Sequence, residues 1–263
     1  MSDEVVSKLN ELLEAEHPEA VAEVGGMGAC CGCEAQTRSQ VYGYLSRAFL
    51  YPHPDTVTHL RENAADIRRC LEALGIEPDV AAWQEALSHD LVEAYVSAFG
   101  HTTSRECPAY EAEYGQADVF RKSETLADIA GFYRAFGVEP RLTDRLDHLS
   151  VELEFMQFLA LKEVYAGARQ HGEDRLALCR EAQAHFLEDH LGRWVAALAL
   201  LLAGKKGAAA YAGLAALVSR FVAWDMGRYG LPPPPPLPLS QEEAPTPACG
   251  ICPEPAAAGG TDY

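Results

Sequence analysis

Asp144, His148 and Glu152 are spaced four residues apart, so on a helix they would share one face. A carboxylate, an imidazole and a second carboxylate in one row could hold a metal ion or relay a proton. The row has only one histidine, however, and the chain lacks the H-E-x-x-H of zinc enzymes, the second-helix ligands of di-iron bundles, a phosphate-binding P-loop and a Ser-His-Asp set. A solvated or capped polar face explains the same spacing, so the pattern gives catalysis little support.

A second group of functional side chains lies in residues 107–114, Cys-Pro-Ala-Tyr-Glu-Ala-Glu-Tyr. Tyrosine supplies contact area and glutamate supplies a bidentate partner for arginine, so Tyr110 and Glu111 suit an aliphatic or basic peptide. Alternatively, the tyrosines pack into the core and the glutamates begin the next helix. The residues and their spacing leave both interpretations open.

The eight cysteines divide by their surroundings. Cys70 and Cys179 lie in apolar helical patterns and are expected to be small buried residues. A CCxC cluster near the start of the sequence and a CxxC pair near its end could bind zinc or an iron–sulfur centre, or form a disulfide, although neither has zinc-ribbon spacing. The candidate metal ligands are Cys30, Cys31, Cys33, Cys249 and Cys252.

The elements that would position these groups are helices. Between residues 36 and 230 apolar residues recur at spacings of three and four, and no segment alternates as a half-buried strand does. Ser123 and Thr143 are the expected N-caps of two of the helices. The expected fold class is all-α, a single antiparallel helical bundle. Its helices are expected at 37–50, 55–74, 78–99, 123–136, 143–160, 174–203 and 206–229.

The two ends of the sequence differ in composition from this domain. Residues 1–35 are expected to form an acidic, cysteine-containing N-terminal extension, broken by a glycine-rich stretch. Residues 36–230 form the helical domain, and residues 231–263 are expected to be a proline-rich, disordered tail.

Charge and hydropathy exclude several classes of protein. With 39 acidic and 21 basic residues the formal net charge is −18, which disfavours nucleic acid and anionic lipid and favours a basic partner, although solubility alone explains it too. The sequence contains no run of about 18 apolar residues of the kind that predicts a membrane span. Its first residues, Met-Ser-Asp-Glu, do not have the pattern of a secretory signal. We expect a cytoplasmic protein without stable membrane insertion.

Several motifs together resemble the TorD/DmsD/NarJ family of redox-enzyme maturation chaperones, over about residues 42–229. One departure lies at residues 141–148, where the usual Glu-Pro-x-Asp-His of the family reads Arg-Leu-Thr-Asp-Arg-Leu-Asp-His, with Glu139-Pro140 upstream. The motifs are residues 42–52 (Tyr-Gly-Tyr-Leu-Ser-Arg-Ala-Phe-Leu-Tyr-Pro), Phe99-Gly100, residues 108–111 (Pro-Ala-Tyr-Glu), Tyr133 with Gly137, and the most specific one, residues 147–156, which begins Asp-His-Leu.

This resemblance implies an all-helical cytoplasmic chaperone, not an enzyme, for molybdenum enzymes of the dimethyl sulfoxide reductase superfamily. It implies that the chaperone binds the client's twin-arginine signal peptide and holds the catalytic subunit until its molybdenum cofactor is inserted, before export. The binding residues it implies are Tyr110, Glu111, Asp147, His148 and Glu152.

The resemblance implies no required cofactor, but it allows contact with a guanine nucleotide or with the molybdenum cofactor, as in some members of the family. Two alternative functions follow from other features. One is a redox or assembly protein that binds zinc or an iron–sulfur centre through the terminal cysteines. The other is a plain scaffold.

Overall fold

The computed structural model describes residues 34–77, 83, 86–88, 90–100, 104–115, 119–138, 145–168, 172–235 and 237–239. The described residues form α-helices, a short 3₁₀ turn and a π-helical turn, with two isolated β-bridges and no strand. The predicted all-α class is confirmed. The helices are α3 (Glu34–Ala48), α4 (Pro54–Ala73), α6 (Leu91–Phe99), α7 (Val119–Ala135), α8 (Leu149–Ala168), α9 (Gly172–Phe186), α10 (Gly192–Gly204) and α11 (Ala209–Arg228), with η1 (Glu111–Glu113) and the π-turn η2 (Leu187–Leu191).

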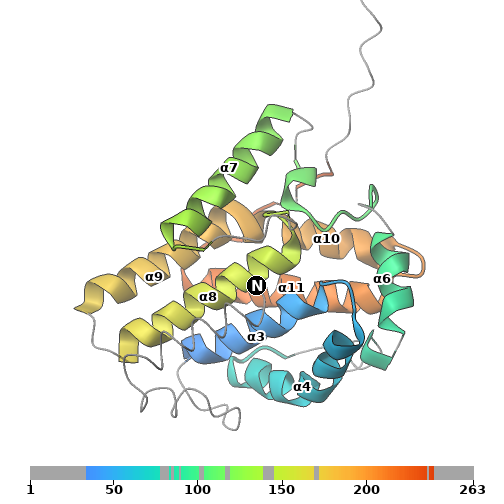
Figure 1. Cartoon of the computed structure of the whole chain (residues 1–263), viewed down its shortest axis with the longest axis horizontal. Helices are drawn as coiled ribbons and strands as arrows, with labels where there is room; N and C mark the ends of the chain where they lie inside the picture. Colours follow the sequence, from blue (N-terminus) through green and yellow to red (C-terminus); the bar gives the residue numbers. More distant parts are fainter. Residues whose placement is uncertain are drawn as a thin grey trace, which may run out of the picture.

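Helix α3 lies at the centre of the bundle. It packs most extensively against α8 and also contacts α4, while α10 and α11 form a second packed pair (Figure 1). Tyr42 and Leu45 of α3, Leu153 of α8 and Phe221 of α11 are fully buried in one continuous apolar core. Helix α7 projects from this body at the top of Figure 1. Among the described residues, no helix combines the length and apolar character needed to cross a membrane.

The prediction of one continuous helix at 78–99 is wrong, because a separate helix, α6, begins at Leu91. Trp83 and residues 86–88 are helical, but the carboxylate of Asp90 then accepts the backbone N–H groups of Val92 at 2.9 Å and Glu93 at 3.3 Å. An aspartate that caps in this way starts a new helix even inside a continuous apolar pattern. The predicted cap at Ser123 is also wrong, since Ser123 lies inside α7.

The helix predicted at 174–203 is interrupted by the π-turn η2, which separates α9 from α10. A π-turn adds a residue to the helical repeat and is often found at functional sites. Gly192 follows directly, and a Cβ at this position would collide with the carbonyl oxygen of Leu187 and with the sulfur of Met226 on α11. Glycine therefore lets α10 begin against α11.

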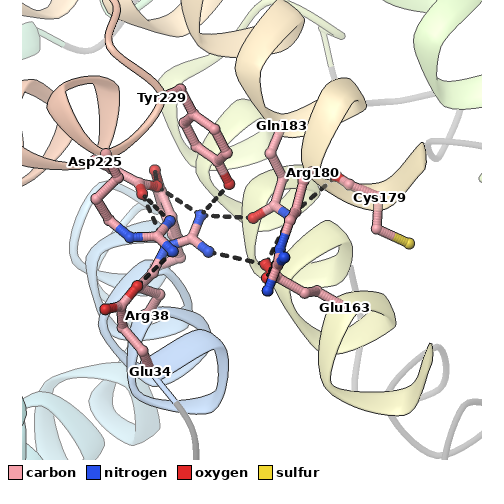
Figure 2. Close-up of polar contacts among 10 residues, drawn as sticks. Glu34, Arg38, Glu163, Cys179, Arg180, Gln183, Asp225 and Tyr229 are labelled. Carbon is pink, nitrogen blue, oxygen red and sulfur yellow. Dashed lines mark hydrogen bonds and ion pairs between the residues drawn. The ribbon is translucent and has the colours of Figure 1, made fainter. Parts of the chain in front are cut away.

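Arg38 of α3 carries a charge in the interior, and its side chain is completely buried. Its guanidinium lies 2.8 Å from a carboxylate oxygen of Asp225 on α11 and donates to Glu163 on α8 at 3.1 Å. It also donates to the side-chain oxygen of Gln183 on α9 at 2.6 Å and to the Tyr229 hydroxyl at 3.2 Å. Figure 2 shows Arg38 between Asp225 and Tyr229 on one side and Glu163 and Gln183 on the other. One buried cation therefore joins four helices.

Further polar contacts complete this network. The Tyr42 hydroxyl donates to Asp225 at 2.6 Å, and Arg180 donates to Glu163 at 2.7 Å. Burial, the largest effect, would lower the pKa of Arg38, but the charge of Asp225, the neighbouring Tyr229 and Tyr42, and the hydrogen bond to Asp225 together outweigh it and raise the pKa. The pKa of Glu163 is lowered in spite of its burial, chiefly by the hydrogen bonds from Arg180 and Gln183. Arg38 and Glu163 therefore both favour their charged forms in this network.

Arg38→Ala should destabilise the domain by about 3 to 5 kcal/mol, because two buried carboxylates lose their shared cation. The free energy of unfolding from urea titration at pH 7 measures this. Arg69→Ala is the control, since Arg69 pairs with Asp66 on the surface of α4 and should change stability by less than about 1 kcal/mol. Equal effects of the two substitutions would contradict the role assigned to Arg38.

Candidate functional site

Tyr110 and His148, which are distant in sequence, meet in an isolated antiparallel β-bridge. The backbone N–H of Glu111 donates to the Asp147 carbonyl at 2.9 Å, and that of Leu149 donates to the Ala109 carbonyl at 2.9 Å. The rings of Tyr110 and His148 pack edge to face with centroids 5.0 Å apart, and both residues are partly exposed. The structure thus brings together two sequence motifs at one place on the surface.

The other end of this loop pairs with the segment after α11. Tyr114 forms a β-bridge with Leu239, and the N–H of Gly115 donates to the Pro238 carbonyl at 2.7 Å. Gly115 has a φ of 94°, a backbone conformation that favours glycine. Leu237 and Leu239 also pack against the core, so the first residues of the predicted tail hold the loop in place.

The predicted helix from residue 143 is wrong, because α8 begins at Leu149 and the described residues before it form a turn. Thr143 and Asp144 lie outside the described residues, so the structure does not test the predicted helix cap at Thr143 or the predicted position of Asp144 on a helix face. His148 is not inside the helix. Its ring Nδ1 accepts the N–H of Ser150 at 3.1 Å, and its carbonyl accepts the N–H of Val151 at 2.8 Å. His148 therefore caps α8 and is not inside the helix that carries Glu152, so the predicted helix face shared by these two residues does not form.

The three predicted acidic residues, Glu111, Asp147 and Glu152, are buried behind the Tyr110–His148 pair. Asp147 accepts the N–H of Ala112 at 3.1 Å, so it supports the short turn η1. Glu111 and Glu152 meet buried partners, and Asp147 pairs with the partly exposed Arg145, while Tyr110 and His148 are themselves partly exposed. Their part in binding a client stays a prediction.

Two residues that contact this acidic cluster, His190 of η2 and Trp194 of α10, were not predicted from the sequence. His190 Nδ1 lies 3.2 Å from a carboxylate oxygen of Glu111, and the Trp194 indole N–H donates to Glu152 at 3.1 Å. On the outer side, His190 Nε2 lies 3.5 Å from Asp128 of α7, whose side chain is 67% exposed. His190 and Trp194 are four residues apart, and this spacing was the one sign in the sequence that the two side chains could face the same site.

Glu152 is fully buried, and one of its carboxylate oxygens has no hydrogen-bond donor. Burial raises the pKa of Glu152 well above its ordinary value, and the negative charges of Glu111 and Asp147 raise it further against the opposing hydrogen bond from Trp194. A proton is therefore held at Glu152 well above the pH at which an exposed glutamate would release it.

Arg145 supplies the positive charge at the surface of this cluster. Its Nε and one terminal nitrogen donate to the two oxygens of Asp147 at 3.0 and 2.8 Å, and the other terminal nitrogen donates to Glu113 at 3.2 Å. The guanidinium carbon lies 4.0 Å from the centre of the Tyr110 ring. Lys122 of α7 also pairs with Glu113, at 2.7 Å. Burial opposes this arrangement, but these hydrogen bonds and charges raise the pKa of Arg145 and lower that of Glu113.

Metal binding finds no support within the part of the chain that the structure describes. No group of three or more His, Cys, Asp or Glu side chains there has metal-binding geometry. Cys70 and Cys179 are buried as predicted, and Cys107 is buried too. The candidate ligands Cys30, Cys31, Cys33, Cys249 and Cys252 lie outside the described residues.

Fold and site together define a class, the all-helical binding proteins, because partly exposed aromatic side chains lie over internally paired acids. Comparison with known proteins narrows this class. The family model described as the nitrate reductase delta subunit matches residues 53–199, which is 147 of the 263 residues. The chain therefore belongs to the nitrate reductase delta subunit family, and the predicted TorD/NarJ-type relationship is confirmed.

Two curated relatives agree with this assignment. The selenate reductase assembly chaperone protein of Thauera selenatis is 30% identical over 156 residues, which cover 58% of this chain and 71% of the relative. The chaperone protein TorD of Vibrio cholerae is 25% identical over 186 residues, which cover 62% of this chain and 79% of the relative. The general role of the chain is that of an assembly chaperone and not of an enzyme, as predicted.

Glu152→Gln should become more stable relative to the natural protein as pH rises from 5 to 8. A raised pKa in the folded state means that Glu152 contributes stability below about pH 4.5, and this contribution is lost as pH rises through the folded-state pKa. Glutamine keeps an acceptor for Trp194 and cannot ionise. Urea unfolding at several pH values measures the difference, and a difference that does not change with pH would contradict a protonated Glu152. Glu181→Gln, on the exposed face of α9, controls for removal of one negative charge.

Proposed function

We propose that this chain is a cytoplasmic chaperone that binds the twin-arginine leader of a molybdenum-enzyme catalytic subunit. It holds the cofactor-free subunit back from export until the molybdenum cofactor is inserted, and it makes or breaks no covalent bond. The names of the two relatives support a reductase as client, since one assembles selenate reductase and the other is TorD.

One structural observation carries this proposal. Tyr110 and His148 come from separate parts of the chain and present a paired aromatic surface directly over a cluster of acids. A leader with consecutive arginines and an apolar stretch offers the complementary chemistry, cations for the acids and aliphatic side chains for the rings. The net charge of −18 would also attract a basic leader at long range.

Replacing both Tyr110 and His148 by alanine should weaken binding of the leader at least tenfold, because the paired ring surface is lost. Isothermal titration with a synthetic leader measures this. The leader comes from the molybdenum-enzyme catalytic subunit encoded beside this chain. A peptide with both arginines replaced by glutamine tests the ionic component and should bind more weakly to the unaltered protein.

Tyr165→Ala combined with His185→Ala is the matched control, since it removes the same two residue types from the far end of α8 and from α9. His148→Asn keeps a side chain able to cap α8, so it separates recognition from helix capping. Unchanged affinity in the Tyr110 and His148 variants would show that leaders bind elsewhere. No binding of either leader to the unaltered protein would reject leader recognition as the function.

A further inference from the structure

The guanidinium group of Arg145 has hydrogen-bond acceptors for its nitrogens and an aromatic ring against one of its faces. Asp147 engages it with both carboxylate oxygens, Glu113 accepts from its third nitrogen, and Tyr110 covers one of its faces at 4.0 Å. Bidentate carboxylate pairing with aromatic stacking is the arrangement that distinguishes arginine from lysine recognition. The Arg145 side chain is nevertheless 39% exposed, so the group lies at the entrance of the acidic cluster and not within it.

Most of the residues that contact Arg145 are also residues of the proposed leader-binding site. Tyr110 and Asp147 belong to the residues predicted for leader recognition, and His148 pairs directly with Tyr110. Asp147 is buried, and both of its carboxylate oxygens pair with the partly exposed Arg145. An arginine from a client would have to enter this same place.

We propose that Asp147, Glu113 and Tyr110 form a binding site for one arginine side chain of the client, and that Arg145 fills this site as an internal ligand until a client arginine displaces it. This inference rests on the proposed function and adds a recognition site and its self-inhibition. Displacement exchanges one guanidinium for another, so Asp147 is never left buried without a cation. The domain therefore stays folded both with and without a bound client. A leader must compete with the Arg145 side chain, which is covalently part of the same protein.

Removing the internal ligand should strengthen leader binding. Arg145→Ala is expected to lower the dissociation constant for the twin-arginine leader about tenfold, and to leave the weak binding of the glutamine-substituted leader unchanged. Adding Asp147→Asn to Arg145→Ala should abolish the gain. Arg180→Ala is the matched control, because Arg180 is also a half-exposed arginine paired with a buried carboxylate, Glu163, but lies in the other polar network. It should not change leader affinity.

Arg145→Gln provides a second variant should Arg145→Ala fold poorly, since glutamine keeps one donor for Asp147 without the guanidinium fork. Unchanged or weaker leader binding in the folded Arg145 variants would overturn the proposal of an internal ligand. If the unaltered protein binds the leader in that case, the proposed function stands and only the internal ligand is rejected.

A test without any leader examines the site itself. Millimolar methylguanidinium should raise the midpoint of thermal unfolding of Arg145→Ala by several degrees, whereas methylammonium at the same ionic strength should not. The unaltered protein, and Arg145→Ala combined with Asp147→Asn, should show no such difference. Equal effects of the two cations on Arg145→Ala would overturn the guanidinium site whether or not the leader binds.

Discussion

The structure depends on a single buried cation, because a charge in an apolar core is tolerated only where its partners hold fixed positions. Arg38 takes its partners from α8, α9 and the C-terminal part of α11, so none of these helices can slide along α3 without breaking a buried hydrogen bond to Arg38. The position of α8 matters most for function. Helix α8 begins at Leu149, directly after the Asp147–His148 turn, and it carries Glu163 further along, so the Arg38 network fixes the helix that has the candidate site at its start.

The candidate site follows a different electrostatic rule from the Arg38 network. The carboxylates of Glu163 and Asp225 each pair with arginines, whereas Asp147 pairs with Arg145, Glu111 lies beside His190, and Glu152 accepts a hydrogen bond from the Trp194 indole. The excess of buried negative charge is relieved by a proton on Glu152 and by an arginine held at the surface. A cluster of buried acids that meets an arginine at its surface in this way is suited to a basic ligand, because a guanidinium from outside could take the place of the one already there.

Much of the fold could be predicted from the sequence, because apolar periodicity directly reports which helix faces are buried. It could not show where one helix ends and the next begins inside a continuous apolar pattern. Asp90 and His148 both start helices through side-chain capping, and in each case periodicity predicted an uninterrupted helix. The sequence did not predict the contact between Tyr110 and His148, because pairing between distant segments leaves no local pattern, and only the family resemblance assigned both residues to one binding site. His190 and Trp194 were missed since their partners, Glu111 and Glu152, lie 79 and 42 residues away.

The π-turn η2 has a consequence for how this chain is aligned with others. Removing one residue from Leu187–Leu191 would restore an ordinary helix and leave the residues after it in nearly the same orientation, because the π-turn accommodates one extra residue. His190 lies inside this turn, so the change would alter how His190 faces Glu111, whereas Trp194 of α10 would keep its place. In homologous chains, therefore, a gap at this turn and the loss of the histidine are expected to occur together, so an insertion of one residue becomes a marker of which chains retain the buried acidic cluster.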